Sequence, residues 1–162
     1  MSPKLAQANL PQLLLKARES IFRHFRPIIT HFGLTEQQWR ILRTLGEHEQ
    51  LEPRELCDMC QILSSSMAGV LARMEAKELI QRAKVPNDQR RVFISTAPKG
   101  EELIAQIAPL IEAQYRYLEE RLGKALVSQT YTTLESLIER EKNSIVQAVE
   151  LPGEAAKQPT GD

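Results

Sequence analysis

The sequence predicts a mainly α fold with a small β-wing, in which a winged helix-turn-helix is combined with a helical dimerisation domain. Two short helical patterns are separated by a three-residue turn, and a hairpin of β-type residues with a basic tip follows them. Long amphipathic patterns lie towards both ends of the chain. Helices of about ten residues joined by three or four residues are typical of a helix-turn-helix.

The composition is that of one ordinary globular domain. The 162 residues are 42% hydrophobic and 26% charged, and no apolar run approaches the roughly 18 residues needed to cross a bilayer. The N-terminal stretch lacks an apolar export-type segment. We therefore expect a cytoplasmic protein that has no membrane partner.

Charge is balanced overall but unevenly distributed. Residues 1–43 contain seven basic and two acidic side chains, whereas residues 101–162 contain six basic and eleven acidic ones. In the expected hairpin, one acid, Asp88, opposes four bases, which are Arg82, Lys84, Arg90 and Arg91. A neutral chain can thus present a local basic surface to phosphates.

The pattern divides the chain into three parts. We expect a first dimerisation helix over 12–33, the winged helix-turn-helix over 34–97 and C-terminal dimerisation helices over 98–149, with flexible termini at 1–11 and 150–162. The terminal helices carry apolar stripes outside the winged-helix core, so they need a partner surface. This predicts a homodimer.

Two helices are expected before the helix-turn-helix. Apolar residues recur every three to four positions up to Phe32, which predicts an amphipathic helix that Pro27 kinks and Gly33 ends. Thr35 is the expected N-cap of the next helix, with Gln38 in the capping-box position. That helix should run to about Gly46 and bury Trp39, Leu42 and Leu45.

The helix-turn-helix follows. Pro53 suits the first turn of a short helix, residues 61–63 form the turn, and one of the serines 64–66 is expected to cap the next helix. The inner face of that helix should consist of Met67, Val70, Leu71 and Met74.

The last third begins with the wing. Strands are expected around Leu79-Ile80 and 92–94, on either side of a Pro86-Asn87-Asp88 turn. Pro98 should open a long helix, kinked near Pro109, that ends near Leu122. Gly123 separates it from a final helix, one side of which should present Tyr131, Leu134, Leu137, Ile138 and Ile145.

The helix beginning near Ser64 has the composition expected of a DNA-reading helix. Small and hydroxyl-bearing residues, Ser64, Ser65, Ser66, Ala68 and Gly69, allow its backbone to approach the floor of the major groove. A helical glycine costs about 1 kcal/mol relative to alanine, so Gly69 indicates either close approach to DNA or tight packing of a neighbouring helix. Arg73, one turn on, is placed for a phosphate.

The tip of the hairpin carries the second DNA signal. Arg90 is a long charged donor able to enter a narrow A·T-rich minor groove. Asp88 is expected to orient a neighbouring arginine through an ion pair.

Four segments resemble the multiple antibiotic resistance regulator (MarR) family of winged-helix repressors. They are Leu34–Leu42, Leu71–Glu75, Asn87–Arg91, which contains the Asp-Xaa-Arg-Arg wing, and Thr96–Leu103. The resemblance covers about residues 13–148. Ala17–Glu19, Phe25–Pro27 and Glu36–Arg40 further resemble the branch that regulates homoprotocatechuate (hydroxyphenylacetate) degradation.

This resemblance implies a homodimer on pseudo-palindromic double-stranded DNA, which represses an aromatic-acid catabolic operon and is released by a small aromatic acid. Two reading heads about 34 Å apart would meet successive major grooves. We expect the DNA contacts to be made by Ser64, Ser65, Ser66, Gly69, Arg73, Asp88, Arg90 and Arg91.

The effector is expected where the dimerisation arm meets the DNA-binding head, because a ligand bound there can change the spacing of the heads. Trp39 offers a flat apolar wall, and an arginine can grip a carboxylate with two donors. The candidates for this site are Arg18, Arg26, Trp39 and Arg43.

Two alternatives remain open for the function. Cys57 and Cys60 make a redox-sensing regulator on the same fold possible, although two small apolar helix residues are the preferred interpretation. The winged helix could instead serve only as a protein-interaction module. Zinc would need four ligands, and the sequence has neither a second cysteine pair nor paired histidines, so no metal or other cofactor is expected. The sequence also lacks nucleophile, metal and phosphate-loop signatures, so we expect no catalytic residues and no enzyme.

Overall fold

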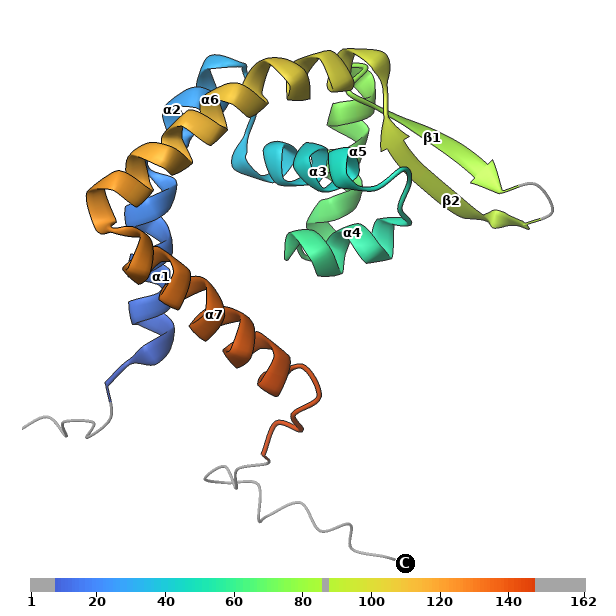
Figure 1. The fold of residues 1–162 in the computed structure, drawn as a ribbon. Coiled ribbons are helices and arrows are strands. Elements are labelled where there is room, and N and C mark those ends of the chain that lie inside the picture. Colours follow the sequence, from blue (N-terminus) through green and yellow to red (C-terminus); the bar gives the residue numbers. More distant parts are fainter. Residues whose placement is uncertain (1–7, 86–87, 148–162) are drawn as a thin grey trace, which may run out of the picture. The chain divides into compact units, whose positions relative to one another are not determined.

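The computed structural model describes residues 8–85 and 88–147. Helices dominate, and a two-stranded antiparallel sheet is inserted between α5 and α6, so the predicted fold class is confirmed (Figure 1). The chain divides into two compact units at Tyr117, within α6. The elements are α1 Leu10–Phe22, α2 Arg26–His31, α3 Glu36–Glu47, α4 Pro53–Cys60, α5 Ser64–Ala76, β1 Ile80–Val85, β2 Asp88–Thr96, α6 Pro98–Leu122 and α7 Lys124–Glu141.

The N-terminal helix is interrupted, whereas the sequence predicted a single kinked helix. It starts at Leu10, capped by the side chain of Asn9, which places its beginning two residues before the expected boundary at 12. α1 ends at Phe22, and α2 restarts with Pro27 in its first turn. Proline has no N–H and its ring clashes with the carbonyl four residues earlier, so one continuous helix is broken here.

α3 begins as predicted. The Gln38 backbone N–H donates to Thr35 Oγ1 at 3.2 Å, and the Thr35 N–H donates to Gln38 Oε1 at 3.0 Å, which completes the capping box. Gly33 has φ +69°, a conformation that a side chain disfavours, so it ends α2 and lets the chain turn into α3. The predicted inner face of α3, with Trp39, Leu42 and Leu45, is buried.

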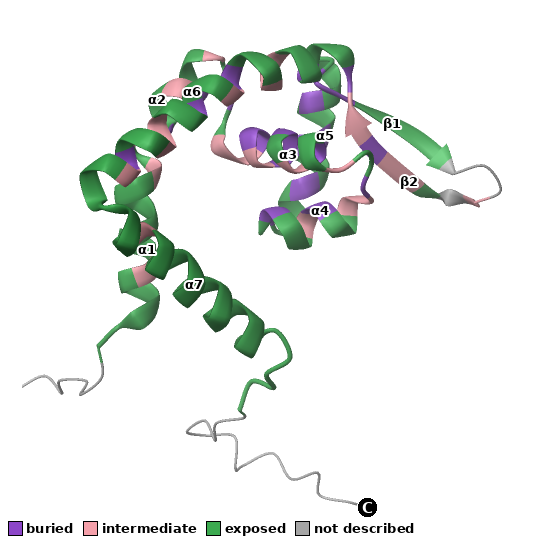
Figure 2. Cartoon of the chain, viewed as in Figure 1, coloured by how far each residue is buried: buried purple, intermediate pink, exposed green. Residues whose placement is uncertain are grey.

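The core of the first unit lies between α3, α4, α5, the sheet and α6, as the purple segments in Figure 2 show. Its most buried large side chains are Ile41, Leu42, Leu56, Leu71, Met74, Ile94 and Ile107. The predicted inner face of α5 belongs to the same core, because Met67, Val70, Leu71 and Met74 are all buried. Hydrophobic burial on this face therefore fixes which side of α5 remains exposed.

The wing is a regular hairpin near its base. Ile80 pairs with Thr96 and Lys84 with Val92, and an irregularity lies between Lys84 and Val85. Residues 86 and 87 of the expected turn lie outside the described residues. Leu51 and Ile94 exchange two backbone hydrogen bonds of 3.0 and 2.8 Å, which attach the wing to the segment between α3 and α4.

α6 packs closely against the start of the wing. A Cβ atom at Gly100 would lie 2.1 Å from the Leu79 carbonyl oxygen, so only glycine allows this approach. The helix continues through Pro109.

The second unit contains the end of α6 and the whole of α7. The apolar side chains of α7 are exposed, among them Leu126, Tyr131, Leu134, Leu137 and Ile138. Ile145, expected on the same helix, lies beyond its end at Glu141 and is 94% exposed. No helix within the described ranges combines the length and hydropathy needed to span a membrane. The expected flexible tail over 150–162 lies outside the described residues.

Candidate nucleic-acid interface

α4 and α5 form a helix-turn-helix with a rigid turn. Gln61 adopts the left-handed conformation, with φ 50° and ψ 51°, and ends α4. The Ile62 N–H donates to the Cys57 carbonyl at 3.1 Å, and the Ile62 side chain is buried. The start of α5 is therefore held in one direction relative to α4.

Arg40 on α3 supports this turn, a role that the sequence did not reveal. Its Nη1 donates to the Cys60 carbonyl at 2.6 Å, and its Nη2 lies 3.6 Å from Glu36 Oε1. The Cys60 carbonyl belongs to the last turn of α4, where carbonyls lack partners within the helix. Arg40 thus caps α4 from a neighbouring helix. Within the described part of the chain, its Nε is a buried nitrogen without a hydrogen-bond partner.

The serines lie at the exposed start of α5, but none of them is the cap. The helix begins at Ser64, and its N-cap is Leu63, which makes no side-chain capping bond. The predicted serine cap is therefore wrong. The Leu63 carbonyl already accepts from the N–H groups of Ser66 at 2.9 Å and Met67 at 3.0 Å, which starts the helix one residue earlier.

Gly69 lies on the exposed face of α5. A Cβ added there would meet only the Arg73 Nη1 atom, at 3.4 Å, which is ordinary contact with the end of a flexible side chain. No other helix of the described chain comes within 4 Å of that position. Of the two explanations for Gly69, tight helix packing is thus unsupported, and close approach of an external molecule remains.

An arginine near the start of β2 is held by an ion pair. Arg91 donates through Nε to Glu52 Oε1 at 2.8 Å, and its Nη2 also contacts this oxygen. The Glu52 hydrogen bond, followed by its negative charge, raises the pKa of Arg91, and Asp88 adds a weaker electrostatic contribution. Glu52 therefore orients this arginine, a partner that the sequence did not indicate. Arg90 lies in β2, and its side chain is outside the described residues.

The first strand of the wing is tied to the reading helix. Arg82 Nε donates to Glu75 Oε2 at 2.8 Å. Two of the four bases counted in the hairpin, Arg82 and Arg91, therefore have acidic partners on α5 and before α4. These two acids partly offset the positive charge that the wing residues carry.

Three of the four effector candidates pair with glutamates, and two of these pairs, those of Arg18 and Arg26, are close. Arg18 on α1 pairs with Glu36, and Arg26 contacts both carboxylate oxygens of Glu19 at 2.7 and 2.9 Å. Both guanidiniums also lie over the Phe22 ring, at 5.1 and 5.2 Å from its centroid. A carboxylate ligand would have to displace these glutamates.

Arg43 has a neutral partner that the sequence did not indicate. Its Nη1 donates to the Tyr115 hydroxyl at 3.2 Å, and this hydrogen bond is the main cause of a raised Arg43 pKa. The Tyr115 ring packs on Phe25, with 4.7 Å between centroids. Trp39 is only 7% exposed, so most of its ring belongs to the core. Tyr115 lies 72 positions after Arg43, and no local spacing connects them.

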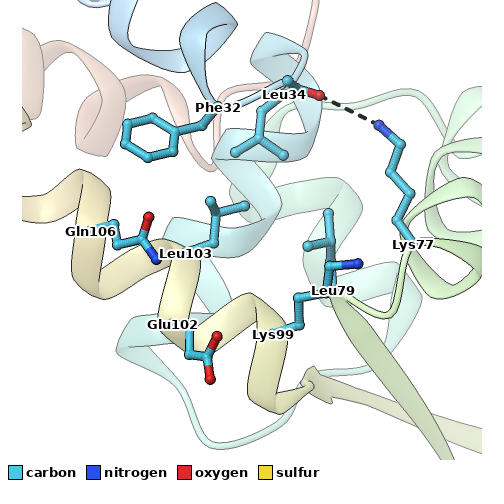
Figure 3. A pocket seen from close by; sticks show the side chains of 9 residues that line it. Phe32, Leu34, Lys77, Leu79, Lys99, Glu102, Leu103 and Gln106 are labelled. Carbon is cyan, nitrogen blue, oxygen red and sulfur yellow. Dashed lines mark hydrogen bonds between the residues drawn. The ribbon is translucent and has the colours of Figure 1, made fainter.

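A cavity of about 360 Å³ lies elsewhere in the first unit, and none of the four effector candidates lines it. Figure 3 shows Phe32, Leu34, Leu79 and Leu103 around it, with Lys77 donating to the Gly33 carbonyl at 3.4 Å. Lys99, Glu102 and Gln106 also line it. Its volume lies within the range of small-molecule sites.

The cysteines are both free. Cys57 is partly exposed, whereas Cys60 is buried and donates to Thr44 Oγ1 at 3.4 Å. Burial raises the pKa of the Cys60 thiol, and the Thr44 hydrogen bond and the Arg40 charge oppose this effect. A thiol with a raised pKa is a weak nucleophile at neutral pH, so Cys60 is a poor candidate for a sensing thiol. Among the described residues, no cluster of three or more His, Cys, Asp or Glu side chains could hold a metal ion.

A helix-turn-helix with an exposed small-residue face, followed by a wing tied to both of its helices, defines a winged-helix DNA-binding protein. The chain matches the MarR family over residues 34–92. It is 40% identical over 111 residues to the HTH-type transcriptional regulator FarR of Neisseria gonorrhoeae, covering 68% of this chain and 76% of that relative. It is 39% identical over 130 residues to the homoprotocatechuate degradative operon repressor of Escherichia coli, covering 80% of this chain and 88% of the relative.

A solved structure agrees with these relatives. The crystal structure of NadR in complex with 4-hydroxyphenylacetate is 36% identical, has a TM-score of 0.73 and covers 85% of this chain and 97% of that one. The chain belongs to the MarR family, so it is a DNA-binding transcriptional regulator and not an enzyme. The resemblance to the homoprotocatechuate branch is confirmed by the same relatives.

Proposed function

We propose that this regulator is a homodimeric repressor of an aromatic-acid catabolic operon and that a small phenolic carboxylate releases it from DNA. The observation that carries this proposal is the exposed first half of α5, where three serines and a glycine that packs against no other described element face solvent. The relatives favour the aromatic acid, since one represses a homoprotocatechuate operon and another is a complex with 4-hydroxyphenylacetate.

The DNA contacts divide by element. Ser64, Ser65 and Ser66 read base edges in the major groove, Gly69 allows the backbone of α5 to approach, and Arg73 binds a phosphate. Arg90 enters the adjacent minor groove. Arg91 and Asp88 orient the wing, with Glu52 as the partner that holds Arg91.

Dimerisation is supported by apolar side chains that the single chain leaves in solvent. Leu13 and Leu15 of α1 are 61% and 62% exposed, and α7 has no buried residue. Such stripes on terminal helices are stabilised when a second copy covers them. A dimer presents two heads, which suits a pseudo-palindromic operator.

Arg43 is the strongest of the effector candidates. Among the described residues, its guanidinium contacts the Tyr115 hydroxyl and, at 3.5 Å, Glu47, so a ligand carboxylate can bind it without breaking a close ion pair. The Tyr115 ring beside this guanidinium supplies aromatic surface, whereas Phe25 and Trp39 are buried and would line the site from the core side. Arg18 and Arg26 contribute if the ligand displaces their glutamates.

The proposal is tested with the DNA upstream of the chain's own gene. In a mobility-shift assay with excess unrelated DNA, the protein should form a specific complex that dissociates when 4-hydroxyphenylacetate or homoprotocatechuate is added. Analytical sedimentation of the free protein should show a dimer. A monomer without affinity for the fragment would contradict the dimeric repressor and favour the protein-interaction alternative. A specific complex that responds to oxidant but to neither acid would favour redox sensing.

A further inference from the structure

Leu63 is an exposed leucine in the helix-turn-helix. Its side chain is 76% exposed, although its neighbour Ile62 and the following Met67 are almost completely buried. Leu63 therefore contributes little to the core. A single exposed leucine is ordinary on a protein surface, but this one is the N-cap of α5 and lies directly before Ser64.

The backbone of Leu63 is held in place. It is the N-cap of α5, and its carbonyl accepts two hydrogen bonds from the first turn of that helix. The preceding residue is anchored by its buried side chain and by its bond to Cys57. The side chain thus starts from a fixed point directly beside Ser64, at the end of α5 that reads DNA.

The chemistry of the major groove offers an apolar partner. Base edges there present hydrogen-bond donors and acceptors, and the C5-methyl group of thymine is their apolar feature. Serines cannot use that methyl group as well as a leucine can. We propose that Leu63 packs against a thymine methyl group in each half-site and makes thymine the preferred base at one position. This inference rests on the proposed role of α5 in the major groove.

The test replaces thymine by deoxyuridine, which lacks only the methyl group. A duplex selected by the wild-type protein from random-sequence DNA is prepared with deoxyuridine at each thymine position in turn. At one position per half-site, wild type should bind the thymine duplex about fourfold more tightly, the ratio expected from burying one methyl-sized group. Leu63→Ala should bind both duplexes equally, and Leu63→Met, which keeps an apolar side chain, should retain the preference.

Met59→Ala is the matched control. Met59 is 48% exposed on α4, before the turn, and its replacement should leave the thymine preference intact. The methyl contact is overturned if Leu63→Ala still binds the thymine duplex more tightly than the deoxyuridine duplex by the wild-type ratio. Loss of a sugar or phosphate interaction would have this result, because it weakens binding to both duplexes by the same factor. If wild type selects a duplex but does not distinguish the two bases, only this inference fails. If wild type selects no duplex, the proposed function fails with it.

Discussion

Arg40 and Cys60 are joined by a hydrogen bond of 2.6 Å between a guanidinium nitrogen on α3 and the last carbonyl of α4. The same guanidinium lies 3.6 Å from Glu36, which also pairs with Arg18 of α1. The contacts thus run from the N-terminal helix to the turn that positions the reading helix.

Replacing Arg40 should destabilise the fold. In Arg40→Met the Cys60 carbonyl loses its donor, and an unsatisfied partly buried carbonyl costs about 1–3 kcal/mol in the free energy of unfolding. Urea denaturation measures this difference. Arg54→Met, which changes an exposed arginine of α4, is the control and should lie close to wild type. Equal stability of both variants would show that the hydrogen bond to Cys60 has no energetic weight.

Gly69→Ala should separate folding from DNA binding. Alanine gains up to about 1 kcal/mol of helix propensity, and its Cβ meets no neighbouring helix, so the free energy of unfolding should rise. Operator affinity should fall at least tenfold because the added methyl blocks close approach of the α5 backbone. Gly46→Ala, in α3, is a control for DNA binding and should leave affinity unchanged. If Gly69→Ala binds the operator as tightly as wild type, DNA binding does not depend on close approach of the α5 backbone at this position.

Arg90→Ala tests the wing. Operator binding should weaken, and the slope of the logarithm of affinity against the logarithm of salt concentration should decrease by about 0.9 for each phosphate that the side chain no longer neutralises. Fluorescence anisotropy over a salt series measures both quantities. Lys99→Ala, in the first turn of α6, should keep the wild-type slope. The same slope and affinity in Arg90→Ala would exclude this residue from the DNA interface.

Tyr115→Phe and Arg43→Gln test the proposed effector site. Removal of the arginine charge should raise the dissociation constant of 4-hydroxyphenylacetate at least tenfold, since a charge-assisted hydrogen bond contributes about 1.5–3 kcal/mol. Tyr115→Phe, which removes only the hydroxyl, should raise this dissociation constant by a smaller factor. Calorimetric titration gives both constants, and Arg116→Gln on the exposed side of α6 is the control. If Arg43→Gln binds 4-hydroxyphenylacetate with wild-type affinity, Arg43 is not part of the effector site, and the cavity beside Leu103 becomes the next candidate.

Cys60 should make stability depend on pH in the alkaline range. Because burial raises the thiol pKa in the folded state, the unfolded chain loses this proton first, from about pH 8.5 upward. The stabilising contribution is complete below that pH and is lost as the pH rises through the folded pKa. Urea denaturation at several pH values should show a smaller loss for Cys60→Ala than for wild type. Coincidence of the wild-type and Cys60→Ala curves would contradict the prediction.

The local elements and the family were readable from the sequence. The capping box of Thr35 and Gln38, the stop at Gly33 and the inner face of α5 all depend on residues within a few positions of one another. Such spacings have the same consequence in any fold, because helix geometry fixes which neighbours meet. The interruption before Pro27 and the start of α5 were placed less well, since several local solutions compete at helix ends.

Only the tertiary structure decided which distant side chains meet. Glu52 holds Arg91 although 39 positions separate them, Tyr115 joins Arg43, and Gly100 lies against the backbone of Leu79. The sequence alone determined that this chain has a reading helix and a wing. The packing of α3, α4, α5 and α6 into one core decided which arginines are held by acids and which side chains remain exposed, because burial of apolar faces sets these distances and local spacing does not.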